Sequence, residues 1–135
     1  MNKQIVGCII VLLLSGCQSM SSGDNLRSFI LGDWQVESVM GTPTVVSPAN
    51  LSFLAGGKIA GNNSCNNFFG SYTVEGDKVK LMPAGSTRMM CPESLMRQAG
   101  LIDKAMPLVA TAEMKTDNLE FLDSAGKSIF ILNKL

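Results

Sequence analysis

The segment LSFLAGGKIAGNNSCNNFFGSYTVEGDKVKL, residues 51–81, decides the fold class of this chain. Short runs in which apolar and polar residues alternate, the pattern of half-buried strands, are separated by turn-forming residues. Gly56-Gly57 and Gly76-Asp77 lie between such runs, and glycine readily adopts the positive φ angles of tight hairpin turns. The segment therefore predicts two antiparallel hairpins, with strands at residues 51–54, 58–60, 72–74 and 79–81.

The flanking sequence extends this pattern and adds one helix. Residues 34–39 alternate in the same way, and residues 119–122 and 129–132 flank a polar turn. From Pro92 to Met106, apolar residues recur at helical spacing, and Pro107 ends the run. We therefore predict a mainly β fold, a small antiparallel β-barrel-like or strongly curved sheet, with one amphipathic helix that covers an open side or end.

The N-terminus predicts export. Lys3 precedes an apolar run, Ile5 to Leu14, which is shorter than the roughly 20 residues that span a bilayer. Leu14-Ser15-Gly16-Cys17 then resembles the bacterial lipobox, in which the cysteine thiol is acylated. We predict a signal peptide at residues 1–16, a lipid anchor and flexible tether at 17–28, and a single domain at 29–135.

Cys17 is thus the predicted contact with a membrane, because a multiply acylated cysteine anchors a protein without a spanning helix. Gln18 follows it. In enteric-type bacteria an aspartate at this position favours retention at the inner membrane, so Gln18 indicates outer-membrane sorting. We expect an outer-membrane lipoprotein whose domain faces the periplasm.

Charge and composition disfavour several classes of function. Eleven basic and eleven acidic residues cancel and form no block of like charge, so a nucleic-acid partner is not expected. The chain has no histidine, and therefore no histidine-based nucleophile pair or proton shuttle. We predict a protein that is not an enzyme and that needs neither a cofactor nor a metal.

Cys65 and Cys91 are the two cysteines that remain once Cys8 leaves with the signal and Cys17 is acylated. In an oxidising compartment their simplest interpretation is a structural disulfide. A metal site is the first alternative, but two thiolates without histidine do not complete a tetrahedral zinc shell. A redox couple is the second, but the Cys-X-X-Cys spacing is absent.

Two segments depart from strand patterning, GNNSCNNFFG at residues 61–70 and STRMMC at residues 86–91. Arg88 is a candidate ligand-binding cation, although an internal ion pair or hydrogen bonds to the first segment are the commoner roles for such a residue. Asn66 is a second candidate, with bonding to its own backbone as the alternative. Met89, Met90 and Met96 could form an adaptable binding surface, but methionines more often fill a core.

Gly61, Cys65-Asn66, Phe68, Gly70 and Tyr72, followed by Ser86-Thr87-Arg88-Met89-Met90-Cys91, resemble the META domain family. Together with the lipobox, this pattern is similar to that of its HslJ-like heat-shock lipoproteins. The resemblance implies an antiparallel β-barrel-like domain with one helix and a link to heat shock and envelope stress. The family offers no established catalytic residues to carry over.

Three functions remain open. The first is a non-catalytic role in envelope or heat stress through contact with an unknown envelope protein. The second is a β-barrel carrier of a small apolar ligand, and the third is an inhibitor of a lytic enzyme. A carrier needs a hollow interior, whereas inward-pointing Trp34, Phe53, Phe121 and Phe130 would fill it.

Overall fold

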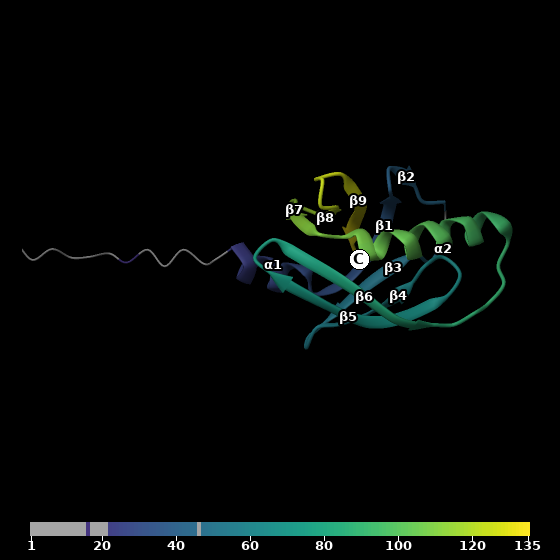
Figure 1. Ribbon diagram of the computed structural model, residues 1–135, viewed down its shortest axis with the longest axis horizontal. Helices are drawn as coiled ribbons and strands as arrows, with labels where there is room; N and C mark the ends of the chain where they lie inside the picture. Colours follow the sequence, from purple (N-terminus) through teal and green to yellow (C-terminus); the bar gives the residue numbers. More distant parts are fainter. Residues whose placement is uncertain (1–15, 17–21, 46) are drawn as a thin grey trace, which may run out of the picture.

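The computed structural model describes residue 16, residues 22–45 and residues 47–135 (Figure 1). Cys17 and most of the predicted signal lie outside the described residues. The described part contains helices α1 (Ser22–Ile30) and α2 (Glu93–Ala105), the short 3-10 helix η1 (Met106–Leu108), and strands β1 (Gly32–Val39), β2 (Thr42–Pro43), β3 (Asn50–Leu54), β4 (Lys58–Asn62), β5 (Asn67–Glu75), β6 (Lys78–Ser86), β7 (Thr111–Met114), β8 (Asn118–Leu122) and β9 (Ser128–Lys134). Neither α-helix in this part is long and apolar enough to cross a membrane.

The strands form one antiparallel sheet that curves back on itself. Its order is β2-β1-β3-β4-β5-β6-β7-β8-β9, and β1 also pairs with β9, so the sheet closes into a ring. β2 is a short addition to the end of β1, with Ser38 opposite Pro43. The prediction of a mainly β, strongly curved antiparallel sheet with one main helix is confirmed.

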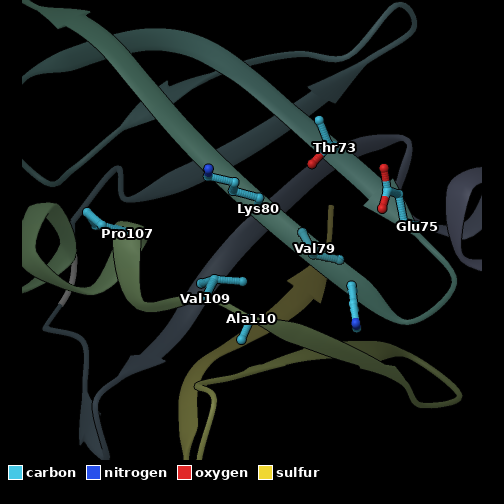
Figure 2. A pocket seen from close by; sticks show the side chains of 8 residues that line it. Thr73, Glu75, Val79, Lys80, Pro107, Val109 and Ala110 are labelled. Atoms are coloured by element: carbon cyan, nitrogen blue, oxygen red, sulfur yellow. The ribbon is translucent and has the colours of Figure 1, made fainter.

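The strand pairing around the ring is shortest between β6 and β7. β6 pairs with β5 along its length but meets β7 only where Lys78 lies opposite Thr111. The Val79 N–H donates across this seam to the carbonyl of Ala110 at 3.0 Å. Figure 2 shows Val79 close to Ala110, at an open pocket of about 440 Å³ that Pro107 also lines.

Pro83 marks the free edge of β6 beyond this seam. Because residues alternate along a strand, Pro83 orients its nitrogen toward the same side as Val79, where no strand of the described residues pairs with it. A proline on that side interrupts no strand pairing, and it discourages another strand from adding to the edge.

Aromatic side chains fill the interior of the ring. Trp34, Phe53, Phe121 and Phe130 are the largest fully buried side chains. The ring centroids of Phe53 and Phe121 are 5.9 Å apart, and those of Phe121 and Phe130 are 6.4 Å apart, both with edge-to-face geometry. The space that a carrier would need for its ligand is therefore occupied by the protein's own side chains.

Helix α1 was not expected from the sequence. It begins at Ser22, inside the segment that we assigned to the tether, and buries Leu26 and Ile30 in the core. The Trp34 Nε1–H donates to the Ile30 carbonyl at 2.8 Å, and the Arg27 guanidinium donates to the Val74 carbonyl. The folded domain thus begins before residue 29. Only one turn separates Leu26 from Ile30, too little for a periodic pattern to indicate a helix.

Helix α2 closely matches its prediction, and its apolar stripe, including Ala99, Ile102 and Ala105, is buried. The main helix is therefore the one that the sequence indicates.

Gly61→Ala should destabilise the domain by about 2–3 kcal/mol, because the added Cβ would lie 2.1 Å from the Asn50 carbonyl oxygen on the neighbouring strand. Gly100→Ala in α2 is the matched control. Its Cβ would meet no atom within 4 Å, so the substitution should stabilise the helix by about 0.5–1 kcal/mol. Urea unfolding followed by the fluorescence of Trp34, the single tryptophan, measures both. Equal effects of the two substitutions would contradict the close approach at Gly61.

Candidate functional site

A disulfide joins the two segments that departed from strand patterning. Cys65 and Cys91 are bonded, with their Cα atoms 5.9 Å apart and a sequence separation of 26. The predicted pairing is confirmed. It links what we call the Asn bend, residues 61–67, to the Arg88 loop, residues 86–91.

Side-chain amides shape the Asn bend. The Asn62 Oδ1 atom accepts a hydrogen bond from the Ser64 N–H at 2.8 Å. The Asn63 Oδ1 atom accepts from the N–H groups of Cys65 and Asn66, at 3.1 and 2.7 Å. Ser64 has a φ of 98°, in the left-handed region that favours glycine. The asparagine side chains thus bond to nearby backbone, and β4 and β5 extend further into the segment than expected.

Asn66 ties the bend to the Arg88 loop. Its Oδ1 atom accepts from the Met89 N–H at 2.5 Å and from the Thr87 hydroxyl at 3.0 Å. Thr87 adds a backbone hydrogen bond from its N–H to the Asn67 carbonyl at 2.9 Å. The side chain of Asn66 therefore bonds to the loop opposite, whereas the alternative had it bonding to its own backbone. Its candidate role in binding a ligand stays a prediction.

A buried glutamine connects the bend to α2. The Gln98 Nε2 atom donates to the hydroxyls of Ser47 and Ser64, at 2.8 and 2.7 Å, and its Oε1 atom accepts from the Val45 N–H at 2.8 Å. The sequence pattern did not indicate a role for this residue. Gln98 lies one position before Ala99, within the apolar stripe of the helix, and a polar residue there is the signal that could have indicated it.

The Arg88 loop exposes its largest side chains. Met90 is 88% exposed and Met89 is 52% exposed, so the expectation that they fill the core is wrong. Arg88 is also exposed, and it makes no hydrogen bond or ion pair with any described residue, so the expected internal partner is absent. The physical reason is the short span between Thr87 and Cys91, whose anchored backbone keeps the intervening side chains outside the ring.

Phe69 adds an aromatic side chain near this loop. The pair Phe68-Phe69 divides between the two faces of the sheet: Phe68 is buried, whereas Phe69 is 62% exposed. The Phe69 ring lies against Gly85, where an added Cβ would come within 2.7 Å of it. The Phe69 ring therefore adds an exposed aromatic surface next to the Arg88 loop.

Gly70 and Tyr72, which belong to the family-like pattern of the sequence, have structural roles. A Cβ on Gly70 would lie 2.2 Å from the Met82 carbonyl oxygen, so β5 and β6 approach closely there. The Tyr72 hydroxyl donates to the Leu54 carbonyl at 3.0 Å, and burial raises the pKa of this phenol above its usual value. Among the described residues, no three metal-ligating side chains gather into a site.

Arg88→Ala should leave the free energy of unfolding within about 1 kcal/mol of wild type, because the side chain is exposed and bonds to no described residue. Asn66→Ala should cost about 1–2 kcal/mol, since it removes the acceptor of two hydrogen bonds to the Arg88 loop. Urea unfolding separates these outcomes. A loss above 2 kcal/mol for Arg88→Ala would show that the guanidinium holds the fold together.

Three solved structures share the fold. The first is the NMR structure of a protein that is 22% identical, with a TM-score of 0.60, and the match covers 79% of this chain and 92% of that one. The second is the crystal structure of a DUF4847 family protein from Bacteroides vulgatus that is 12% identical, with a TM-score of 0.62, and the match covers 82% of this chain and 97% of that one. The third is the NMR structure of a protein from Burkholderia xenovorans that is 16% identical, with a TM-score of 0.61, and the match covers 100% of this chain and 99% of that one. At these identities the likeness shows the fold alone. A search of curated proteins finds no match. The family model of the META domain matches residues 27–134.

Proposed function

The chain belongs to the META domain family, and from this premise we propose that it is an HslJ-like lipoprotein, anchored to the outer membrane through Cys17. In this proposal the domain faces the periplasm and acts in envelope or heat stress by contacting another envelope protein. It performs no catalytic turnover of its own.

The observation that carries the contact function is the exposure of Arg88, Met89 and Met90 on a loop whose backbone is held in place. The disulfide fixes one end of this loop, and the bonds from Thr87 and Met89 fix the rest. A surface that is already ordered loses less conformational entropy when it binds. Arginine, methionine and aromatic side chains are also the types enriched in protein interfaces.

The position of this surface supports a partner away from the anchoring membrane. α1 begins at Ser22, five residues after Cys17 in sequence, and five extended residues span at most about 18 Å. In Figure 1, α1 lies at one end of the long axis of the domain, whereas the chain between β6 and α2 lies toward the other. A short anchor would therefore keep α1 near the membrane and direct the Arg88 loop into the periplasm.

Site-specific cross-linking in cells tests the contact. The full-length lipoprotein carries p-benzoylphenylalanine in place of Met90, and in a control in place of Met114, which is also exposed but lies on β7. We expect a discrete cross-linked adduct in heat-stressed cells from position 90 alone, and its loss when Arg88→Ala is added. Identical adducts from both positions, or none from position 90, would contradict the contact function.

Acylation has its own test. Mass spectrometry of the purified native protein should find a mature chain that begins at an acylated Cys17. Cys17→Ser should abolish the lipid while the domain still folds, because its core begins at α1. An unmodified chain that still begins at Met1 would rule out the anchor.

A further inference from the structure

An open groove of about 490 Å³ lies between the end of β6 and the helical segment formed by α2 and η1. The buried side chains of Phe68 and Met106 contribute to it from the core, and Pro83 and Pro107 are exposed at its sides. Its volume is within the range of ligand sites, roughly 300–1,000 Å³, but the groove is open to solvent. An open groove can hold a short stretch of a longer chain, whereas a small molecule is held best where it is enclosed.

Two opposite charges line this groove without pairing with each other. They are Arg88 and Asp103, and the ion pairs found among the described residues are two others, Arg97 with Glu93 and Lys115 with Glu113. A cation and an anion kept apart in one groove can each bind a group of the opposite sign. The groove therefore complements a ligand that carries both charges.

The polar network of the Asn bend holds the anionic side in place. The Asn63 Nδ2 atom donates to the Asp103 Oδ1 atom at 2.9 Å, and Asn63 is itself buried. The second carboxylate oxygen of Asp103 is left for another donor, since its residue is exposed. On the cationic side, the hydrogen bond from the Met89 N–H to Asn66 fixes the backbone next to Arg88. Both charges thus extend from ordered backbone.

The groove is continuous with the surface of the proposed function, because Arg88 belongs to both. We propose that the groove binds a short segment of a protein partner in which an apolar residue stands between an acidic and a basic residue. Arg88 donates to the carboxylate of the segment in a two-pronged hydrogen bond, and Asp103 accepts from its cationic side chain. The apolar residue packs on Pro83 and Pro107, the exposed apolar side chains of the groove. This inference rests on the proposed contact function and adds the chemistry of the partner.

The segment binds through its side chains and does not add as a strand to β6. Pro83 lies in the groove and lacks an N–H, and it points its nitrogen to the free edge. A continuous ladder of backbone hydrogen bonds is therefore interrupted at Pro83.

Peptide binding to the mature lipoprotein in nanodiscs tests the proposal. The probes are fluorescent seven-residue peptides with an Asp-Leu-Lys or a Lys-Leu-Asp centre in a Gly-Ser background, which covers both directions of the chain. Fluorescence anisotropy should detect binding of at least one of them, and both Arg88→Gln and Asp103→Asn should raise its Kd about tenfold. Arg97→Gln is the matched control, because Arg97 is an exposed arginine of α2 that pairs with Glu93 outside the groove, and it should leave the Kd unchanged.

A double-mutant cycle assigns the contacts. The peptide in which its aspartate becomes asparagine should bind wild type about tenfold more weakly, and Arg88→Gln should then cause no further loss. The peptide in which lysine becomes glutamine should behave in the same way with Asp103→Asn. Absence of binding by both charged peptides, or an equal loss for every peptide with Arg88→Gln, would overturn the proposal.

The cross-linking experiment separates this proposal from the proposed function. If position 90 gives its adduct while no peptide binds, the groove proposal is wrong and the contact function stands. If the charged peptides bind and follow the cycle while position 90 gives no adduct, the groove is a binding site and the proposed contact in stressed cells is wrong.

Discussion

Phe121→Ala should lower the free energy of unfolding by about 4 kcal/mol, because the ring is fully buried and its removal leaves a cavity at the centre of the closed sheet. Phe121 packs edge-to-face with Phe53 and Phe130, from β3 and β9, so its loss affects packing between strands on different sides of the ring. Urea unfolding measured by Trp34 fluorescence provides the value.

Phe69→Ala is the control for this substitution. The same ring is removed there, but from an exposed position on the outer face of β5, and the expected cost is below about 1 kcal/mol. If the two substitutions cost the same, the interior of the ring is not packed in the way described, and a carrier function would become open again.

Removal of the disulfide by Cys65→Ala with Cys91→Ala should cost about 3.5 kcal/mol, the loop-closure entropy expected for a separation of 26 residues. The reason lies mainly in the unfolded state, which gains conformations once the cross-link is absent. Reduction of the wild-type protein with dithiothreitol is the control and should produce a similar loss.

The Arg88 loop should stay close to the bend in this double variant, because the bonds from Met89 to Asn66 and from Thr87 to Asn67 do not depend on sulfur. Adding Asn66→Ala should then release the loop and lower the free energy of unfolding by more than the sum of the separate effects.

Thiol labelling of the denatured, unreduced wild type should find no free thiol at Cys65 or Cys91, and two labelled thiols would refute the bond.

Much of the fold follows from local sequence patterns. Local patterns predict three features that the structure contains: the hairpins around Gly56-Gly57 and Gly76-Asp77, the helix after Pro92, and the disulfide between Cys65 and Cys91. Each depends on spacing between neighbouring residues or on the absence of other cysteines in the domain. β7 was missed, because residues 111–114 bury only one side chain and are too short for alternation to be recognised.

The candidate site was predicted less well than the fold. The sequence indicated the Asn bend and the Arg88 loop as unusual, but it assigned Met89 and Met90 to the core and Arg88 to an internal partner. It also did not indicate Gln98 as a link between α2 and the bend, nor Asp103 as a neighbour of Arg88 in the groove. These properties depend on residues distant in sequence, which local patterns do not describe.

By itself the sequence determined which residues are apolar in each element, where the chain turns and which cysteines can pair, because these follow from periods of two or 3.6 residues and from simple counting. The tertiary structure alone decided that β9 returns to β1 and closes the ring, that aromatic rings fill it, and that a cation and an anion of one groove form no ion pair with any described residue. The physical reason is that side-chain exposure is set by which distant elements pack together. Val36 and Leu132 lie opposite each other only because the whole sheet curves until its first and last long strands meet.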